Sequence, residues 1–241
     1  MNREVAVVIP ARYKSTRFPG KPLALINGRE MILRVADNAA AAVGKEKVYV
    51  ATDSDLIEQR VKEEGYNVVR TSSNCLTGTD RVAEASREIE ESIIVNLQGD
   101  EPLINPQDII SVIETKKENL NSIINSMTRL REDERPDDRA TIKVVTTIDG
   151  FLLYGSRNPI PGTKKGTSSK IKKQGGIYAF TKEQLALYST SETKTPLEAE
   201  EDIEVLRFLE LGIPVKMVEV STPTVAVDYP DDIELVEQIL N

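Results

Sequence analysis

A short stretch near the amino end of the chain carries four cationic side chains, Arg12, Lys14, Arg17 and Lys21. Gly20 and the prolines near it favour a turn-rich loop over a helix. Guanidinium groups can grip phosphate oxygens in a bidentate way, and a lysine adds a point charge. The residue types and their spacing therefore predict a site for the phosphates of a ligand.

This loop is not a Walker P-loop, although it contains a Gly-Lys pair. That motif also needs a glycine five residues before the Gly-Lys pair and a Ser or Thr after the lysine. In this chain Ser15 and Pro22 occupy those two positions. Side chains must then do most of the work that backbone amides do in a P-loop. A solvated basic loop is the alternative interpretation, and the position directly after a buried strand favours the ligand site.

Two aspartates, Asp100 and Asp228, each come where an apolar run typical of a strand ends. Mg²⁺ prefers one or two carboxylates together with phosphate oxygens of a substrate, which makes Asp100 a candidate ligand. An aspartate that only forms a turn is the alternative. Asp228 repeats the arrangement, and Asp231 or Asp232 suits the cap of the next helix better. Gln98 points to the same face as Asp100 and could hydrogen-bond a sugar.

Composition narrows the chemistry further. The 241 residues include no histidine, so Ser-His-Asp triads, histidine bases and His-bearing zinc sites are excluded. The net charge of −8 argues against a general nucleic-acid binder. One cysteine, Cys75, fits a reducing cytoplasm, and the apolar run before Pro10 is too short for a signal segment or a membrane span. We expect a cytoplasmic protein whose ligand is small and anionic.

These side chains need a framework, and hydrophobic periodicity predicts an α/β fold with a mostly parallel sheet and right-handed crossovers. The first strand begins at Val5, and its pairing should stop at Pro10, which has no N–H. The run at 92–97 is apolar enough to be a central strand. Expected helices cover 31–43, 54–64, 77–89, 106–119, 181–188, 196–212 and the end of the chain from 230; other expected strands cover 47–52, 66–70, 122–130, 175–180, 215–220 and 224–227.

An antiparallel element interrupts this order late in the chain. Two β-rich runs, 141–148 and 151–156, flank Asp149-Gly150, which is a strong hairpin signal. The lysine-rich segment 163–173 is expected to be a flexible loop, or a lid over an anionic substrate. The mixed-charge segment 131–139 is expected to be solvated surface.

Several motifs together resemble one family. The stretch IPARYKSTRFPGKPL is similar to the opening signature of nucleotidyltransferases that make CMP-activated 2-keto-3-deoxy sugar acids, most of all the 3-deoxy-manno-octulosonate (Kdo) cytidylyltransferase family. Further matches follow in the same order at 77–81, 95–102, 156–157, 176–178 and 227–232. The resemblance implies a Rossmann-like nucleotidyltransferase sheet, CTP and a 2-keto-3-deoxy sugar acid as substrates, and Mg²⁺ as cofactor.

The resemblance also implies roles for matching residues. Nucleotide-binding residues would be Ala11, Arg12, Ser15, Lys21, Gly78 and Thr79. Sugar-binding residues would be Gln98, Arg157, Tyr178 and Glu204. The metal would be held jointly by Asp100 and Asp228, and the catalytic residues would be Arg12, Arg17, Lys21 and Asp100.

Physical chemistry supports some of these roles and leaves alternatives. The guanidinium of Arg157 suits the planar carboxylate of the sugar acid. The small residues Gly78 and Thr79 would let the backbone approach cytosine and offer it N–H groups, whereas a plain helix cap is the alternative. Glu204 would accept a sugar hydroxyl, or form an exposed ion pair with Arg207 one helical turn away.

The implied reaction is attack of the anomeric hydroxyl on the α-phosphorus of CTP, with pyrophosphate leaving. Three departures from the family pattern keep a related acid open as substrate, either an 8-amino-octulosonate or a nonulosonate. They are Gln174 for a histidine, Gly162 for an aromatic residue, and a short, lysine-rich loop between them. A non-catalytic nucleotide-sugar-binding protein is another alternative. A dehydrogenase would need a glycine fingerprint that this chain lacks.

We expect residues 1–241 to form a single nucleotidyltransferase domain, within which 122–180 is a candidate antiparallel arm. In the resembled family such a region packs between two subunits and borders the sugar site. The resemblance thus implies a homodimer, with neither nucleic acid nor a membrane as partner.

Overall fold

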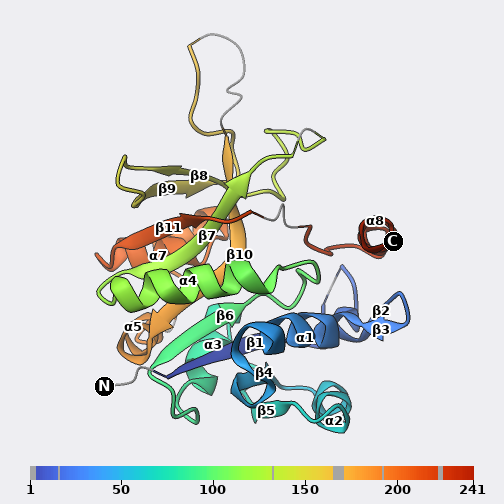
Figure 1. Ribbon diagram of the computed structural model, residues 1–241. Coiled ribbons are helices and arrows are strands. Elements are labelled where there is room, and N and C mark those ends of the chain that lie inside the picture. Colours follow the sequence, from blue (N-terminus) through green and yellow to red (C-terminus); the bar gives the residue numbers. More distant parts are fainter. Residues whose placement is uncertain (1–3, 16, 132, 165–170, 192, 222–224) are drawn as a thin grey trace.

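The computed structural model describes residues 4–15, 17–131, 133–164, 171–191, 193–221 and 225–241. Within them, nine strands form one sheet, whose main path runs in the order β11-β7-β10-β6-β1-β4-β5 (Figure 1). Pairing is parallel along this path except at β10, which is antiparallel to both of its neighbours. The predicted α/β class is confirmed. The strands are β1 Val5–Ala11, β4 Val48–Thr52, β5 Asn67–Arg70, β6 Ile93–Leu97, β7 Ile123–Arg129, β10 Lys172–Thr181 and β11 Val215–Glu219.

The first strand continues past Pro10, contrary to the expectation. Pro10 lies opposite Ala51 of β4, and Ala11 lies opposite Thr52. On the other side the ladder with β6 has already ended at Val8. The Pro10 carbonyl faces that side, 3.1 Å from where a Cβ of Gly99 would lie. The missing N–H therefore points to a place where no ladder bond is needed, and pairing with β4 survives.

The helices begin where short polar side chains can cap them. Ser54, Thr77, Asn105 and Thr181 each accept a hydrogen bond from the first turn of the helix that follows. The α-helices are α1 Met31–Val43, α2 Asp55–Glu63, α3 Gly78–Ala85, α4 Pro106–Glu118, α5 Lys182–Tyr188, α6 Pro196–Glu201, α7 Val205–Glu210 and α8 Asp232–Leu240. Short 3₁₀ turns occupy Lys21–Leu23 (η1) and Lys45–Lys47 (η2), and β2 Leu25–Ile26 pairs with β3 Arg29–Glu30 in a separate small hairpin.

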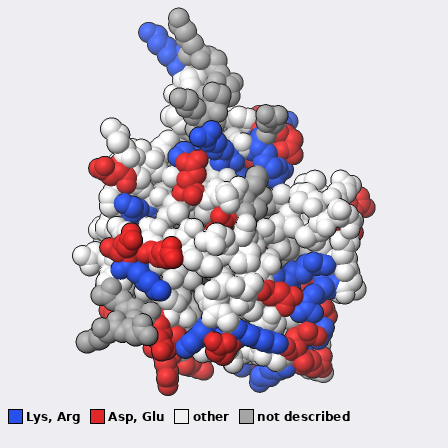
Figure 2. All heavy atoms as spheres, in the orientation of Figure 1, with Lys and Arg blue, Asp and Glu red and all other residues white. Residues whose placement is uncertain are grey.

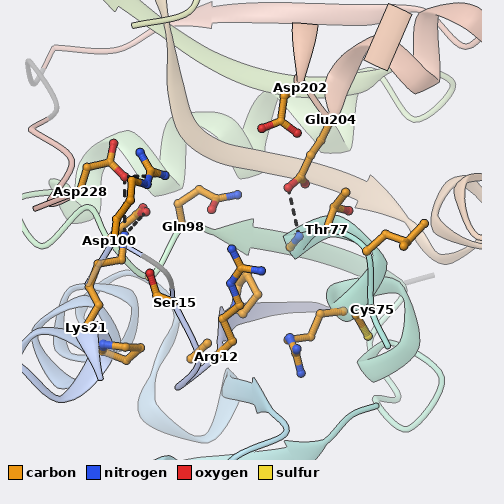
Figure 3. Close-up of a pocket in the computed structure, with 18 of the residues that line it drawn as sticks. Arg12, Ser15, Lys21, Cys75, Thr77, Gln98, Asp100, Asp202, Glu204 and Asp228 are labelled. Carbon is orange, nitrogen blue, oxygen red and sulfur yellow. Dashed lines mark hydrogen bonds and ion pairs between the residues drawn. The ribbon is translucent and has the colours of Figure 1, made fainter. Parts of the chain in front are cut away.

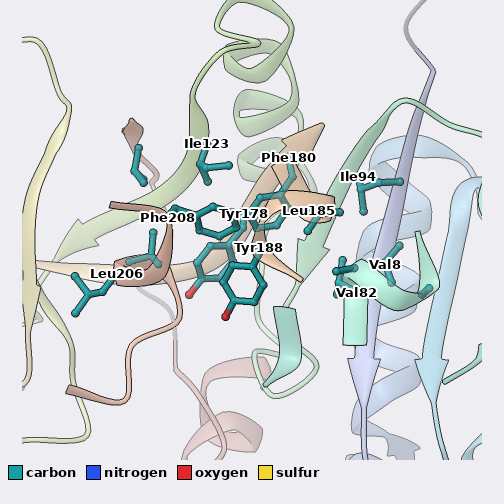
Figure 4. Packing of buried hydrophobic residues seen from close by; sticks show 14 of the residues in the cluster. Val8, Val82, Ile94, Ile123, Tyr178, Phe180, Leu185, Tyr188, Leu206 and Phe208 are labelled. Carbon is teal, nitrogen blue, oxygen red and sulfur yellow. The ribbon is translucent and has the colours of Figure 1, made fainter. Parts of the chain in front are cut away.

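Two hydrophobic layers cover the two faces of the sheet. Because strand side chains alternate, Val7 and Ile9 of β1 pack with α1, α2 and α4, whereas Ala6 and Val8 pack with α3, α5 and α7. In the second layer Phe180 of β10 stacks near Phe208 of α7, with ring centroids 5.3 Å apart (Figure 4). The two layers make the sheet a rigid platform whose strand ends carry the site.

Several expected boundaries differ. The helix expected over 196–212 is split into α6 and α7, because Asp202 adopts a left-handed conformation with φ of 52°. Helix α3 ends at Ala85, and residues 225–227 are not a strand. Most of the lysine-rich segment, 165–170, lies outside the described residues.

The predicted hairpin is confirmed: β8 Lys143–Thr146 pairs with β9 Leu152–Ser156 around Asp149-Gly150, and β8 also joins the end of β10. It lies beside one end of the main sheet (Figure 1). The single-domain assignment of 1–241, and the role of 122–180 in dimerisation, stay predictions.

None of the described helices combines the length and apolarity needed to cross a bilayer. Acidic and basic side chains of the described residues are interspersed on the face shown in Figure 2.

Candidate active site

A cleft of about 270 Å³ opens at the carboxyl ends of β1 and β6. Figure 3 shows Lys21, Asp100 and Asp228 on one side of it and Thr77 and Glu204 on the other. Most of the predicted site residues line this cleft: Ala11, Arg12, Ser15, Arg17, Lys21, Gly78, Gln98, Asp100, Glu204 and Asp228. The cleft continues into a larger hollow of about 1070 Å³, since the two share Arg17, Gln98, Asp100, Asp202, Glu204 and Asp228 in their linings.

Ion pairs join the cationic loop to both aspartates. The Nζ of Lys21 lies 2.8 Å from Asp100 Oδ2 and 4.0 Å from Asp228 Oδ1. Arg17 Nη2 lies 3.1 Å from Asp228 Oδ1, and its guanidinium lies 5.7 Å from the centre of the Tyr229 ring. The fold thus brings together residues that are widely separated in sequence, as the proposed phosphate and metal roles require.

Backbone contacts hold the carboxyl-terminal aspartate in place. Lys21 Nζ also donates to the carbonyl of Val227, whose N–H donates to the carbonyl of Asp100; both distances are 2.8 Å. The Asp232 carboxylate accepts from the N–H groups of Asp228 and Tyr229 at 2.8 and 2.7 Å. Asp232 therefore fixes the backbone before α8. Neither it nor Asp231, which is the N-cap residue and makes no side-chain cap bond, caps the helix as expected. The Asp228 carboxylate is left to line the cleft.

The two aspartates suit a hard divalent ion. Their oxygens converge on one ammonium group, which shows that they can serve a single cation. Among the described residues they are not part of a group of three or more His, Cys, Asp or Glu side chains that could enclose a metal. A donor set of this kind fits Mg²⁺, which completes its shell with phosphate oxygens and water.

The N-terminus of α3 is already engaged by a carboxylate. Glu204 accepts from the N–H groups of Gly78 and Thr79 at 3.0 and 2.9 Å, and burial raises its pKa despite these bonds. The amides expected to meet cytosine are therefore taken up by Glu204. Thr79 is 1% exposed and accepts from Asn96 through its hydroxyl, so its side chain belongs to the core and does not line the cleft.

The alternative of an exposed pair between Glu204 and Arg207 is wrong. Arg207 is fully buried and forms a two-pronged ion pair with Glu198, with Nε···Oε2 at 2.5 Å and Nη2···Oε1 at 2.7 Å. Its Nη1 lies 3.0 Å from Asp80 Oδ1 on α3. Glu204 and Arg207 therefore each bind α3, one at its first N–H groups and the other at Asp80.

On the sugar side, Arg157 and Tyr178 line the larger hollow. The Arg157 guanidinium donates to the carbonyls of Arg139, Glu201 and Asp202 at 2.6 to 2.9 Å. These bonds hold the end of α6 in place. The guanidinium N–H groups that were expected to bind a substrate carboxylate therefore bind backbone carbonyls. Tyr178 is 7% exposed and stacks on Phe180 with centroids 6.2 Å apart.

Sequence reasoning missed several lining residues, including Cys75, Lys194, Asp202 and Glu101. Burial, followed by the nearby charge of Asp100, raises the pKa of Glu101 to about 8. Burial and the bond to Glu84 raise the pKa of Cys75 to about 11, which keeps it a thiol. The paired glycines at 175–176 were the available signal for Glu101, since a glycine within a strand often marks a close approach. No local signal indicated Asp202.

Comparisons with known proteins agree with this geometry. A family model described as "Cytidylyltransferase" matches residues 6–217. A 3-deoxy-manno-octulosonate cytidylyltransferase 2 from Hydrogenovibrio crunogenus is 41% identical over 245 residues, which cover 98% of this chain and 97% of the relative. The 3-deoxy-manno-octulosonate cytidylyltransferase of Escherichia coli is 34% identical over 237 residues, with 98% and 96% covered.

A solved structure of CMP:2-keto-3-deoxy-manno-octonic acid synthetase complexed with CTP superposes with a TM-score of 0.90 at 34% identity, covering 98% of each chain. Similarity in sequence and in fold therefore extends over nearly the whole chain, the cleft included. The chain belongs to the cytidylyltransferases, and among them to the 3-deoxy-manno-octulosonate cytidylyltransferase family.

Proposed function

We propose that this protein transfers CMP from CTP to the anomeric hydroxyl of 3-deoxy-manno-octulosonate and releases pyrophosphate. The observation that carries the proposal is the junction of Lys21 and Arg17 with Asp100 and Asp228 in one cleft. Such a site offers cations for the triphosphate and hard oxygen ligands for a divalent ion. The names of the relatives, and the CTP complex of the similar solved structure, support the choice of nucleotide and sugar acid.

In this reaction the protein positions reactants and neutralises charge. Arg12, Arg17 and Lys21 hold the β- and γ-phosphates and stabilise the departing pyrophosphate. Asp100 and Asp228 are the residues that would hold Mg²⁺. When bound, that ion would offset charge on the α-phosphate and favour loss of the proton from the attacking hydroxyl.

A related acid is the second candidate for the acceptor. Gln174 stands where a histidine was expected, lines the larger hollow, and donates through Nε2 to Asn125 Oδ1 at 2.8 Å. An amide and an imidazole differ in shape and in hydrogen-bonding capacity, which favours testing 8-amino-octulosonate and nonulosonates beside the parent acid.

The test is a pyrophosphate-release assay with Mg²⁺ that crosses the four ribonucleoside triphosphates with a panel of 2-keto-3-deoxy acids. We expect turnover with CTP and 3-deoxy-manno-octulosonate above all other pairs. Preference for another acid would select the second candidate. Binding of CTP without turnover of any acid would indicate a non-catalytic nucleotide-binding protein and overturn the proposal.

Asp100→Asn and Asp228→Asn should each lower kcat/KM at least about 100-fold, because each removes charge that offsets the phosphates. Asp149→Asn is the matched control, since Asn-Gly supports the same hairpin turn and the residue lies outside both linings. Near-normal pyrophosphate release by either cleft variant would refute the metal assignment.

The proposal includes a homodimer formed through the β8–β9 hairpin. Leu153 of β9 is 60% exposed and Ile148 in the turn is fully exposed, so the hairpin offers apolar side chains that a second subunit could cover. A cytoplasmic location is also proposed, supported by the single cysteine, and cell fractionation would test it. The net charge of −8 would repel the phosphate backbone of nucleic acid, which favours small ligands as partners.

A further inference from the structure

One residue that lines the larger hollow has a buried carboxyl oxygen to which none of the described residues donates a hydrogen bond. Glu101 lies directly after Asp100, is 8% exposed, and lines the hollow. Within the described part of the chain, its Oε2 is buried and has no hydrogen-bond partner. A buried polar atom without a partner is costly, so its retention calls for a physical reason.

The neighbouring strand leaves room for this side chain. A Cβ on Gly176 of β10 would lie 2.6 Å from both Cδ and Oε1 of Glu101, and 3.0 Å from Cβ of Gln98. Any other residue at 176 would displace the carboxyl group or the strand. Gly176 therefore forms a recess in which the Glu101 carboxyl group is held against the sheet.

The recess lies among the residues assigned to the sugar. Gln98, Tyr178 and Glu204 line the same hollow as Glu101. Glu204 already accepts two backbone N–H groups, and the Arg157 guanidinium donates to three carbonyls. Glu101 thus lines the hollow and carries an acceptor, the buried Oε2, that the described residues leave without a donor. A sugar acid carries several hydroxyl groups, each of which can donate to a carboxyl oxygen.

We propose that Glu101 accepts a hydrogen bond from a hydroxyl group of the sugar acid through Oε2, and that Gly176 preserves the space this contact needs. Glu101 is then a specificity-determining residue, because a site built to bind a hydroxyl rejects analogues that lack it. The inference rests on the proposed function, since it takes its ligand from that reaction.

Glu101→Gln tests the contact with little change in shape. We expect the KM for the sugar acid to rise about tenfold or more, because an amide offers one acceptor oxygen where a carboxyl group offers two, and its NH₂ group can only donate. The KM for CTP should stay within about twofold. Gly176→Ala should act in the same direction by displacing the carboxyl group, and thermal unfolding of both variants shows whether the fold is intact.

Glu91→Gln is the matched control. Glu91 is 5% exposed and also has a buried Oε2 without a partner among the described residues, but it precedes β6 and pairs with Lys47, at the opposite end of that strand. The same substitution there should leave the KM for the sugar acid unchanged. An equal rise in both variants would overturn the inference, because it would reflect burial alone.

Analogues of the sugar acid that each lack one hydroxyl provide a test that needs no variant. At least one of them should lose about tenfold or more in kcat/KM with the wild-type enzyme, and the same analogue should lose little further with Glu101→Gln. Additive losses for every analogue, or an unchanged KM in Glu101→Gln, would overturn the inference. If the wild-type protein turns over no acid at all, it is the proposed function that fails.

Discussion

The position of Asp228 depends on a second side chain, that of Asp232. Its carboxylate pairs with Arg17 and Lys21 on one side of the cleft, whereas its backbone N–H donates to Asp232 at 2.8 Å. Asp232 also binds the N–H of Tyr229, whose ring lies beside Arg17. The carboxylate of Asp232, at the start of α8, therefore sets the direction in which the proposed metal-binding carboxylate points.

Asp232→Asn should weaken this control. An amide is a poorer acceptor for the two N–H groups, so we expect the Mg²⁺ concentration for half-maximal activity to rise about 10- to 100-fold, as is typical when a residue that orients a metal ligand is changed. Activity at saturating Mg²⁺ should recover in part. Pyrophosphate release measured over a range of Mg²⁺ concentrations checks this.

Asp231→Asn is the control for that experiment, because Asp231 makes no side-chain capping bond to α8. Its Mg²⁺ dependence should match that of the wild type. If Asp232→Asn had the same Mg²⁺ dependence as the wild type, the orientation of Asp228 would not depend on the bonds that Asp232 accepts.

At the scale of elements, helices α3, α6 and α7 are joined by buried polar groups behind the cleft. Arg207 of α7 binds Glu198 of α6 and Asp80 of α3. The N-cap of α3, Thr77, donates to Asp80 at 2.7 Å and contacts the Tyr188 hydroxyl at 3.2 Å. The wall of the cleft at the start of α3 is thus positioned by a fully buried ion pair, Arg207–Glu198, and by the mostly buried carboxylate of Asp80.

Arg207→Met should destabilise the protein by about 3 to 5 kcal/mol, because it leaves the buried Glu198 carboxylate unpaired. Denaturant unfolding monitored by circular dichroism measures the loss. Adding Glu198→Leu should restore part of the stability, since it removes the fully buried carboxylate and leaves only Asp80, which is partly exposed, without its partner. A shifted α3 should also raise the KM for CTP in the single variant.

Arg135→Met removes an exposed pair, Arg135–Asp137, whose side chains are 78% and 60% exposed. It should cost less than about 1 kcal/mol. A similar cost for Arg135→Met and Arg207→Met would show that burial of the Arg207 pair contributes nothing special.

At the scale of the whole molecule, the β8–β9 hairpin extends the sheet beyond the layers of helices and carries exposed apolar side chains. Leu153→Asp should therefore convert the proposed dimer to a monomer, because it buries a charge in an apolar contact. Multi-angle light scattering gives the mass directly. Leu56→Asp on α2 is the control, since Leu56 is 54% exposed on a different element. A monomeric wild type would contradict the proposed assembly.

Local sequence signals determined much of the fold. Helix α1 begins and ends where its apolar spacing and Gly44 predicted, and Ser54, Asn105 and Thr181 cap helices as expected. Periodicity and capping act within a few residues, so they can be read without knowledge of the fold. The motifs also indicated the cationic loop and the two aspartates, because residue type and strand-end position are local properties as well.

Tertiary structure decided which partners those residues take. Glu204 binds the α3 amides instead of Arg207, the Arg157 guanidinium is held by carbonyls, and the helix expected over 196–212 is broken at Asp202. Glu101 lines the larger hollow against Gly176, where a Cβ would lie 2.6 Å from its carboxyl group. These outcomes depend on competition between donors and acceptors from elements far apart in the chain. The sequence of one segment does not say where the other segment lies in the folded protein, so it could not predict these partners.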